Sequence, residues 1–134
     1  MNISLDDALV LMAAARKKAD EIGVPMVIAV VDTGGNLVAE HRMDDALLVS
    51  VDIARNKAYT SVAVKVATED LAKAAQPGES LYGIHATDQG RIVIFGGGVP
   101  LYRGETLIGG LGVSGGSVEQ DVSCAKAGQA ALSL

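Results

Sequence analysis

The chain has 134 residues, of which 49% are hydrophobic and only 3% aromatic, and its formal net charge is −5. This hydrophobic fraction excludes disorder, and the length fits a single domain, which we place at residues 1–134. No apolar run reaches the roughly 20 residues that cross a bilayer, and no Lys/Arg cluster would bind nucleic acid or an anionic membrane. The acidic N-terminus resembles neither a signal nor a transit peptide, so we expect a cytoplasmic protein.

The N-terminal segment has the pattern of an amphipathic helix over residues 5–22. Ser4 and Asp7 have the spacing of a capping box, and Gly23 followed by Pro25 supplies a stop. Apolar residues between them recur at three and four positions. The predicted buried stripe consists of Leu5, Ala8, Leu9, Met12, Ala15, Ala19 and Ile22.

Two strands and two helices are predicted next. Residues 26–31 are continuously apolar and β-branched, as in a strand that is covered on both faces. The glycine pair in 33–36 is typical of a hairpin turn, and residues 37–43 alternate between apolar and polar. Helical periodicity then predicts helices over 46–61 and 69–75.

The rest of the chain predicts a loop, three strands and a last helix. The strands are expected at 91–95, 99–103 and 106–113, and the helix at 117–132, where Ser117 and Gln120 form a second capping box. Hairpin connections make the predicted five-stranded sheet mostly antiparallel. Because its apolar strand needs cover on both faces, we expect an α+β fold, a three-layer α/β/α sandwich.

Glycine-rich loops in the second half are candidates for a ligand site, since nine of the 16 glycines lie between positions 96 and 116. Glycine lets a ligand approach the backbone, and bare amides before a helix bind anions. The alternatives are a bend in the strand and amides satisfied by the helix cap. The candidate residues are Gly96, Gly97, Gly98, Ser114, Gly115, Gly116 and Ser117.

Five polar side chains are further candidates. Arg42 could hold a carboxylate, or it could pair with Asp44 at a strand-to-helix corner. Tyr82 and His85 lie in the long loop that precedes the last strands, where functional residues are common. His41 and His85 are both candidate haem ligands, although a lone His is more often a structural residue.

Other features predict no site. Lys57 is expected to be a solvated lysine on its helix, and the single Cys124 an inert core thiol. The glycine motif at 110–115 lacks the second parallel strand of a nucleotide-binding unit. No Cys-x-x-Cys-His segment and no zinc-ligand spacing occur, so we expect neither covalently attached haem nor a metal site.

Ordered motifs along nearly the whole chain resemble the GlcG/HbpS/PduO C-terminal family. They read GVPMVIAVVDTGGNLVAEHRMDDA, ARNKAYTSV, LYGI, IVIFGGGVPL and IGGLGVSGGSVEQD, and the departure from the family is Asp45, where Gly is usual. The resemblance implies a profilin-like fold, homo-oligomers, and haem binding in some members. Other members are encoded beside genes of glycolate or diol metabolism. The adenosyltransferase activity of PduO belongs to a separate domain and is not implied.

We therefore expect a small accessory protein that binds haem or a small organic acid, forms a homo-oligomer and serves glycolate, diol or glycerol catabolism. An enzyme acting on a small carboxylate, with Arg42 as its anion clamp, is the first alternative. A structural or assembly partner without a ligand is the second.

Overall fold

The computed structural model describes residues 1–132. Most predicted helices and strands are confirmed, with ends displaced by a few residues. The elements are α1 (Leu5–Ile22), β1 (Val27–Val31), β2 (Leu37–Arg42), α2 (Val49–Val64), α3 (Thr68–Ala74), the short 3₁₀ helices η1 (Ile84–Ala86) and η2 (Asp88–Gly90), β3 (Gly98–Arg103), β4 (Thr106–Ser114) and α4 (Val118–Ala130).

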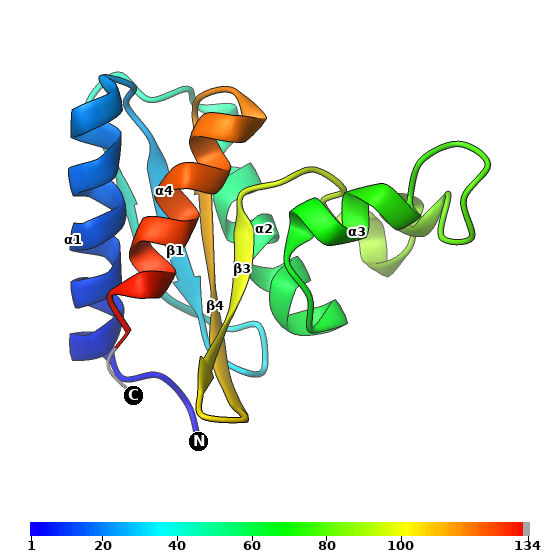
Figure 1. Cartoon of the computed structure of the whole chain (residues 1–134), viewed down its shortest axis with the longest axis horizontal. Coiled ribbons are helices and arrows are strands. Elements are labelled where there is room, and N and C mark those ends of the chain that lie inside the picture. The colour runs from blue at the N-terminus through cyan, green and yellow to red at the C-terminus, as the bar shows by residue number, and fades with distance from the viewer. Residues whose placement is uncertain (133–134) are drawn as a thin grey trace.

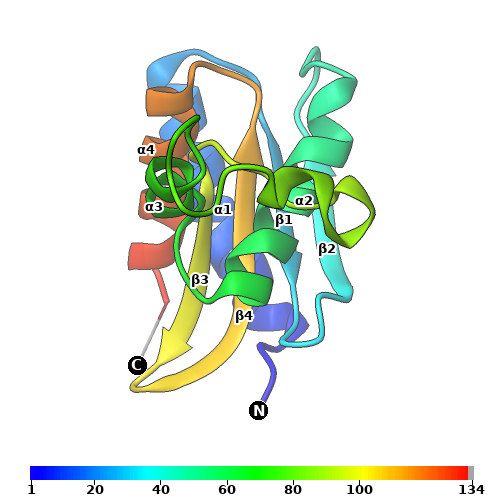
Figure 2. The same ribbon diagram turned by 90° about the vertical axis from the view of Figure 1, so that its right-hand side faces the viewer.

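The sheet has four strands in the order β2-β1-β4-β3, and every neighbouring pair is antiparallel (Figures 1 and 2). The prediction of a fifth strand at 91–95 was wrong. The backbone N–H of Val93 donates instead to Thr60 Oγ1 on α2, 3.0 Å away. This segment therefore crosses α2 and carries the chain to β3, although its residues have strand propensity.

Helices lie on both faces of the sheet, which confirms the α+β class, while the likeness to profilin stays a prediction. The helices α1 and α4 pack side by side on one face, and α2 covers the other (Figure 1). All five residues of β1 are buried, as its sequence predicts. Ile28 and Val30 join the core beneath α1 and α4, and the alternate residues Val27 and Ala29 pack toward α2.

Glycine lines the face of β4 on which α2 lies. A Cβ added at Gly112 would overlap the carbonyl oxygen of Ala54, and one added at Gly110 would lie 2.5 Å from the carbonyl oxygen of Ala58. The backbone of α2 therefore contacts the strand directly. The intervening residue Leu111 points to the opposite face, toward α1 and α4.

The buried face of α1 overlaps the predicted stripe. Ala8, Met12, Ala15 and Ala19 are buried as predicted, and Leu11 joins them, whereas Leu5 and Leu9 are 53% and 39% exposed. On a helix of 3.6 residues per turn, the buried face is therefore turned from Leu5 and Leu9 toward Leu11. The capping by Ser4 is confirmed, because its hydroxyl accepts from the N–H of Asp7 at 3.1 Å.

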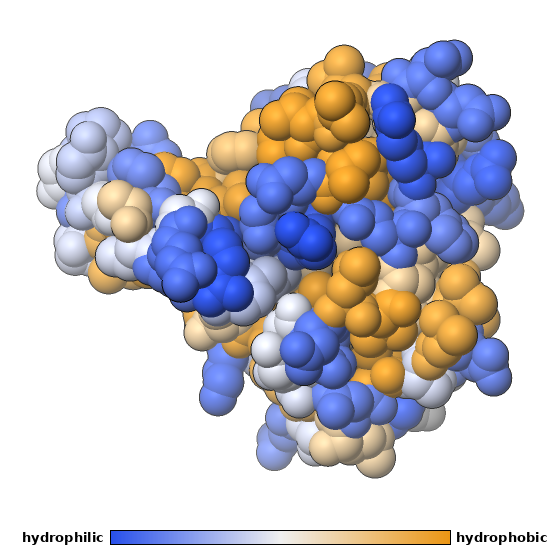
Figure 3. Space-filling model, turned by 180° about the vertical axis from the view of Figure 1, so that it is seen from behind, coloured by the Kyte–Doolittle hydropathy of each residue, from blue (hydrophilic) through white to orange (hydrophobic). Residues whose placement is uncertain are grey.

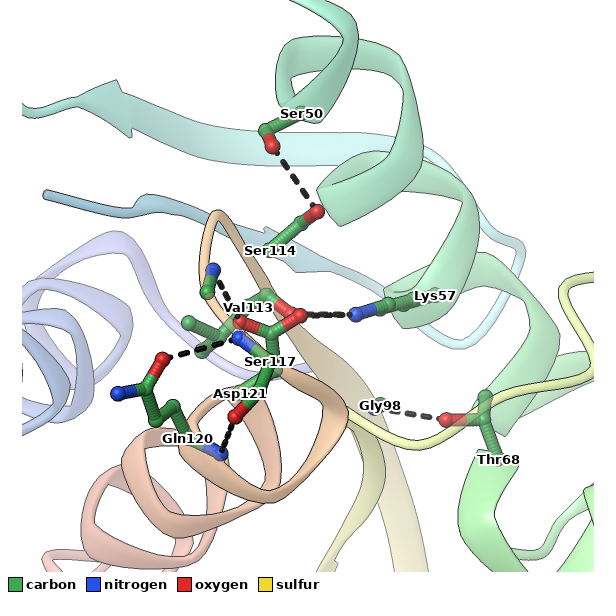
Figure 4. A network of polar contacts seen from close by, with 10 residues as sticks. Ser50, Lys57, Thr68, Gly98, Val113, Ser114, Ser117, Gln120 and Asp121 are labelled. Carbon is green, nitrogen blue, oxygen red and sulfur yellow. Dashed lines mark hydrogen bonds and ion pairs between the residues drawn. The ribbon is translucent and has the colours of Figure 1, made fainter. Parts of the chain in front are cut away.

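A buried ion pair joins α2 to β4 and α4 (Figure 4). The ammonium of Lys57 is completely buried and donates to Asp121 Oδ2 at 2.8 Å and to the carbonyl oxygen of Val113 at 2.9 Å. It also lies 5.1 Å from the centre of the Phe95 ring. The prediction of a solvated lysine was wrong. Burial lowers the pKa of Lys57, and the hydrogen bond to Asp121 opposes this effect.

We predict that Gly112→Ala destabilises the fold. Its Cβ would overlap the α2 backbone, and overpacking of this kind costs about 1–3 kcal/mol. Urea denaturation measures the loss. Gly34→Ala is the control, because its Cβ would meet the amide end of the flexible Asn36 side chain. Equal stability of the two variants would show that α2 does not pack on β4 at this distance.

We predict that Lys57→Met is strongly destabilising, because it leaves the Asp121 carboxylate buried without its cation. Removing one partner of a buried pair costs about 3–5 kcal/mol. Adding Asp121→Asn removes the unpaired charge and keeps an acceptor for the Gly116 N–H, so the double variant should regain part of the loss. Chemical denaturation of the single and double variants provides the measurement. A Lys57→Met protein as stable as the wild type would contradict the pair's structural role.

Candidate functional site

A groove of about 540 Å³ lies between α1 and the edge strand β2. Apolar side chains from α1, β1 and the residue after β2 form most of its lining, and polar residues of α1 and β2 complete it. The lining residues are Leu9, Met12, Ala13, Arg16, Ile28, Glu40, His41, Arg42 and Met43. The groove is thus an apolar hollow bordered by charged and imidazole groups.

The pairing of β1 and β2 directs His41 toward the groove. His41 is opposite Ile28, whose side chain belongs to the core beneath α1, and opposed residues of an antiparallel pair point to the same face. His41 is exposed, so its imidazole is accessible to a ligand. Beside it, Met43 is held by its sulfur, which accepts from the N–H of Met26 at 3.3 Å.

Two arginines are among the lining residues of the groove, and only Arg16 directs its side chain from α1, because Arg42 is opposite Val27 on the α2 face of the sheet. The guanidinium of Arg42 donates through Nε and Nη2 to the carbonyl oxygen of Ala46, at 3.1 and 2.7 Å, and so fixes the chain after β2. This contact takes the place of the predicted pairing with Asp44. Arg16 on α1 forms only a long, exposed ion pair with Asp20, at 3.7 Å. An exposed pair of this kind is weak, so Arg16 can turn to another anion.

Glu40 on β2 is also among the lining residues, but its side chain points to the α2 face, and one of its carboxylate oxygens has no partner. Among the side chains of residues 1–132, Oε2 of Glu40 is buried and makes no hydrogen bond. Burial raises the pKa of Glu40, against the opposing effect of Arg55 on α2. A buried carboxylate oxygen without a donor costs free energy, so this position favours an added cation or donor.

Tyr82 and His85 lie away from the groove, on the segment that joins α3 to residue 91. This segment projects from the body of the molecule, and we call residues 76–91 the arm (Figure 1). The rings of Tyr82 and His85 meet edge to face, with centroids 5.9 Å apart. The two side chains therefore contact each other, and neither lines the groove.

The glycine loops are filled by the protein's own atoms. A Cβ at Gly97 would lie 2.6 Å from Lys57 Nζ, and Gly98 donates its N–H to Thr68 Oγ1 at 2.9 Å. Gly96 faces Val118 and Val122 of α4 in the same way.

The amides before α4 are satisfied within the protein, which confirms the alternative of a helix cap and not the bare anion site. The N–H of Gly116 donates to Asp121 Oδ1, and that of Ser117 to Gln120 Oε1, both at 2.9 Å. A Cβ at Gly115 would meet the carbonyl oxygen of Pro25 at 2.5 Å. Ser114 donates to Ser50 in a buried contact of 3.0 Å. Helix capping and the ion pair with Lys57 thus use the groups that an anion would need.

The structure therefore separates the predicted site residues. His41 and Arg42 line the groove, and Asp44 borders an adjoining hollow together with Arg16 and Asp20. The residues that the sequence analysis missed come from α1, whose Leu9 it assigned to the core. A leucine and an arginine seven residues apart lie on one side of a helix, which was the available indication of a shared surface.

The described residues contain neither a metal-binding cluster of His, Cys, Asp and Glu side chains nor a membrane-spanning helix. Over residues 1–132, no group of three His, Cys, Asp or Glu side chains could hold a metal ion. Within the same range, none of the helices has the length and hydropathy needed to cross a membrane. Cys124 is buried, and burial raises the pKa of its thiol to about 11, as expected for an unreactive core residue.

Comparison with known proteins identifies relatives along the whole chain. The chain is 51% identical over 128 residues to an uncharacterized 15.0 kDa protein of the dhaT-dhaS intergenic region of Citrobacter freundii, covering 90% of each. It is 48% identical to the corrinoid adenosyltransferase PduO of Citrobacter freundii over 134 residues, all of this chain and 40% of PduO. The chain thus spans two fifths of PduO's length.

A solved structure shares the fold. The crystal structure of a PduOC:heme complex superposes with a TM-score of 0.94 and 47% identity, covering 98% of this chain and 95% of that one. The family model described as haem degrading protein HbpS-like matches residues 3–130. The chain therefore belongs to the HbpS-like family.

Proposed function

We propose that this protein binds haem in the groove between α1 and β2. The observation that carries the proposal is an apolar hollow of about 540 Å³ with an accessible imidazole, His41, on one wall. Haem is a large apolar ring with an iron at its centre and two carboxylates at its edge. A relative 47% identical to this chain has been crystallised with haem, which supports this choice of ligand.

The residues present fit such a group. Leu9 and Ala13 would offer apolar contact to the ring above the buried Met12 and Ile28, and the imidazole of His41 would ligate the haem iron. Arg16 is available for a propionate, since its pairing with Asp20 is long and exposed. Bound haem would supply an iron with redox and oxygen chemistry. The protein would hold the apolar face of the ring in the groove and would orient the ring through its carboxylate edge.

His41 is better placed for this role than His85. His41 lies on a strand of the sheet and borders the apolar groove, whereas His85 lies on the arm, away from the groove-lining residues. Ligands on regular elements are held more rigidly than ligands on loops.

The first alternative, an enzyme with Arg42 as its anion clamp, has less support. Two nitrogens of this guanidinium donate to the carbonyl oxygen of Ala46, so the side chain already fixes the chain after β2. An accessory role in diol or glycerol catabolism and a homo-oligomeric state remain part of the proposal. The relationship to PduO and to the protein of the dhaT-dhaS region supports the former.

Titration with hemin, followed by absorbance, tests the site. We predict a shifted Soret band for the wild type and at least tenfold weaker binding for His41→Ala, a loss of about 1.4 kcal/mol, because the axial ligand is gone. His85→Ala is the matched control and should bind as the wild type does. A wild-type protein without a Soret shift would refute haem binding, and equal affinity of all three proteins would refute His41 as the ligand.

A second titration tests the charged edge of the groove. We predict that Arg16→Gln weakens hemin binding several-fold and leaves the position of the Soret band unchanged, because the arginine contacts a propionate and not the iron. The control is Lys17→Gln, which removes a neighbouring exposed cation that does not line the groove. Equal losses in both variants would indicate general attraction of an anion and would contradict a specific contact with Arg16.

A further inference from the structure

Three of the four methionines in the chain lie in the groove or directly beside it. Met12 of α1 and Met43, which follows β2, are among the lining residues, and the completely buried Met26 contacts Met43. Met12 is 1% exposed and so forms the floor of the groove, whereas Met1, the fourth methionine, is 78% exposed. The function proposed above uses the apolar character of this hollow and leaves its sulfur atoms without a role.

The pairing of β1 with β2 places the thioether of Met43 beside the imidazole of His41. The backbone N–H of Met43 donates to the carbonyl oxygen of Met26 at 3.0 Å, which continues the antiparallel register one pair beyond Arg42. Met43 follows His41 by two positions, so both side chains lie on the α1 face, and that of Met43 packs against the core there. Residues two positions apart on a strand are separated by about 7 Å. An imidazole and a long thioether side chain can close that distance around one ion.

The sulfur atom of Met43 is held in position and keeps the capacity to bind a metal. Its Sδ accepts the N–H of Met26 at 3.3 Å, a weak contact that engages one lone pair of the thioether and leaves the other free. Met12 lines the same groove from α1. One imidazole and two thioethers, contributed by two elements, therefore border a single hollow.

The chemistry of these three donors selects one class of metal ion. Mg²⁺ and Ca²⁺ bind oxygen ligands, and zinc sites consist of thiolate, imidazole and carboxylate groups. Thioether sulfur is a soft donor that favours Cu(I), and imidazole also binds copper. The three donors are uncharged, which suits a monovalent ion. Arg16, the cation that lines the groove from α1, is paired with Asp20 at 3.7 Å, and this pair offsets its charge.

Exposed apolar surface alone does not distinguish the groove from the rest of the molecule. Separate hydrophobic patches, interrupted by hydrophilic side chains, lie on the face seen in Figure 3. The groove differs because a nitrogen donor and two sulfur donors border it.

We propose that the groove binds a Cu(I) ion through the imidazole of His41 and the thioethers of Met43 and Met12. This site does not depend on haem binding, although both ligands would use His41. Thioethers are not zinc ligands, so the lack of zinc-ligand spacing in the sequence does not bear on this site.

Competition with a chromophoric Cu(I) chelator, in the presence of ascorbate and without oxygen, measures the affinity. We expect the wild type to bind one equivalent of Cu(I), and His41→Ala, Met43→Leu and Met12→Leu each to bind it at least tenfold more weakly. Leucine keeps the volume and apolar character of methionine, so the two methionine variants lose little besides the sulfur. Met1→Leu and His85→Ala remove the same donor types outside the groove and should bind as the wild type does.

Three outcomes of this titration would overturn the proposal. They are a wild type that takes no Cu(I) from the chelator, unchanged affinity in any of the three groove variants, and an equal loss of affinity in the two controls.

X-ray absorption at the copper edge is a second test that needs no variant, and it decides the matter even if the buried Met12→Leu substitution disturbs folding. We expect the wild-type protein loaded with Cu(I) to show sulfur neighbours together with an imidazole nitrogen. The native Cys124 is completely buried, and burial raises the pKa of its thiol to about 11, so it does not supply the sulfur. A spectrum with only nitrogen and oxygen neighbours would overturn the proposal.

Hemin titration of the same proteins separates this proposal from haem binding. Met43→Leu should weaken Cu(I) binding and leave hemin binding as in the wild type, because leucine keeps the apolar wall and His41 is retained. A wild type that binds Cu(I) through these donors but shows no Soret shift would refute haem binding and leave the copper site standing. A wild type that shifts the Soret band of hemin but takes no Cu(I) from the chelator would refute the copper site and leave haem binding standing.

Discussion

The packing of α2 directly on the backbone of β4 is the constraint on which the rest of this structure depends. Glycines at 110 and 112 permit the approach, and the completely buried Lys57 ammonium ties α2 to the Val113 carbonyl oxygen and to Asp121 on α4. An ion pair that is removed from water is stable only with close geometry and satisfied hydrogen bonds, and here both are present. The three contacts hold the elements on the two faces of the sheet in one arrangement.

This arrangement explains why the glycine-rich second half of the chain contributes to packing and leaves no free backbone amides before α4 to bind an anion. Asp121 receives Lys57 on one oxygen and the Gly116 amide on the other, and Gln120 receives the amide of Ser117. The loops are therefore satisfied internally. The apolar hollow appears at the opposite edge, where β2 is covered only partly by α1.

Sequence reasoning predicted the regular elements well and the site poorly. Capping boxes, the hairpin glycines and the apolar run of β1 act locally, so their patterns are readable in the chain. Residues 91–95 have the composition of a strand, yet Thr60 on α2 takes the N–H of Val93. Lys57 lies three residues after Ala54 and four before Ser61, both buried, so its position in the stripe was visible. Its partner Asp121 is 64 residues away, and no local pattern identifies that pairing.

The ligand wall and the fold share one short strand. In β2 the side chain of His41 points to the α1 face and its neighbours Glu40 and Arg42 to the α2 face, because residues of a strand alternate. His41 can therefore face a ligand while Arg42 fixes the chain after β2 through the carbonyl oxygen of Ala46. The backbone of β2 couples the two roles, since the contact that orders this edge of the sheet also holds the wall of the groove.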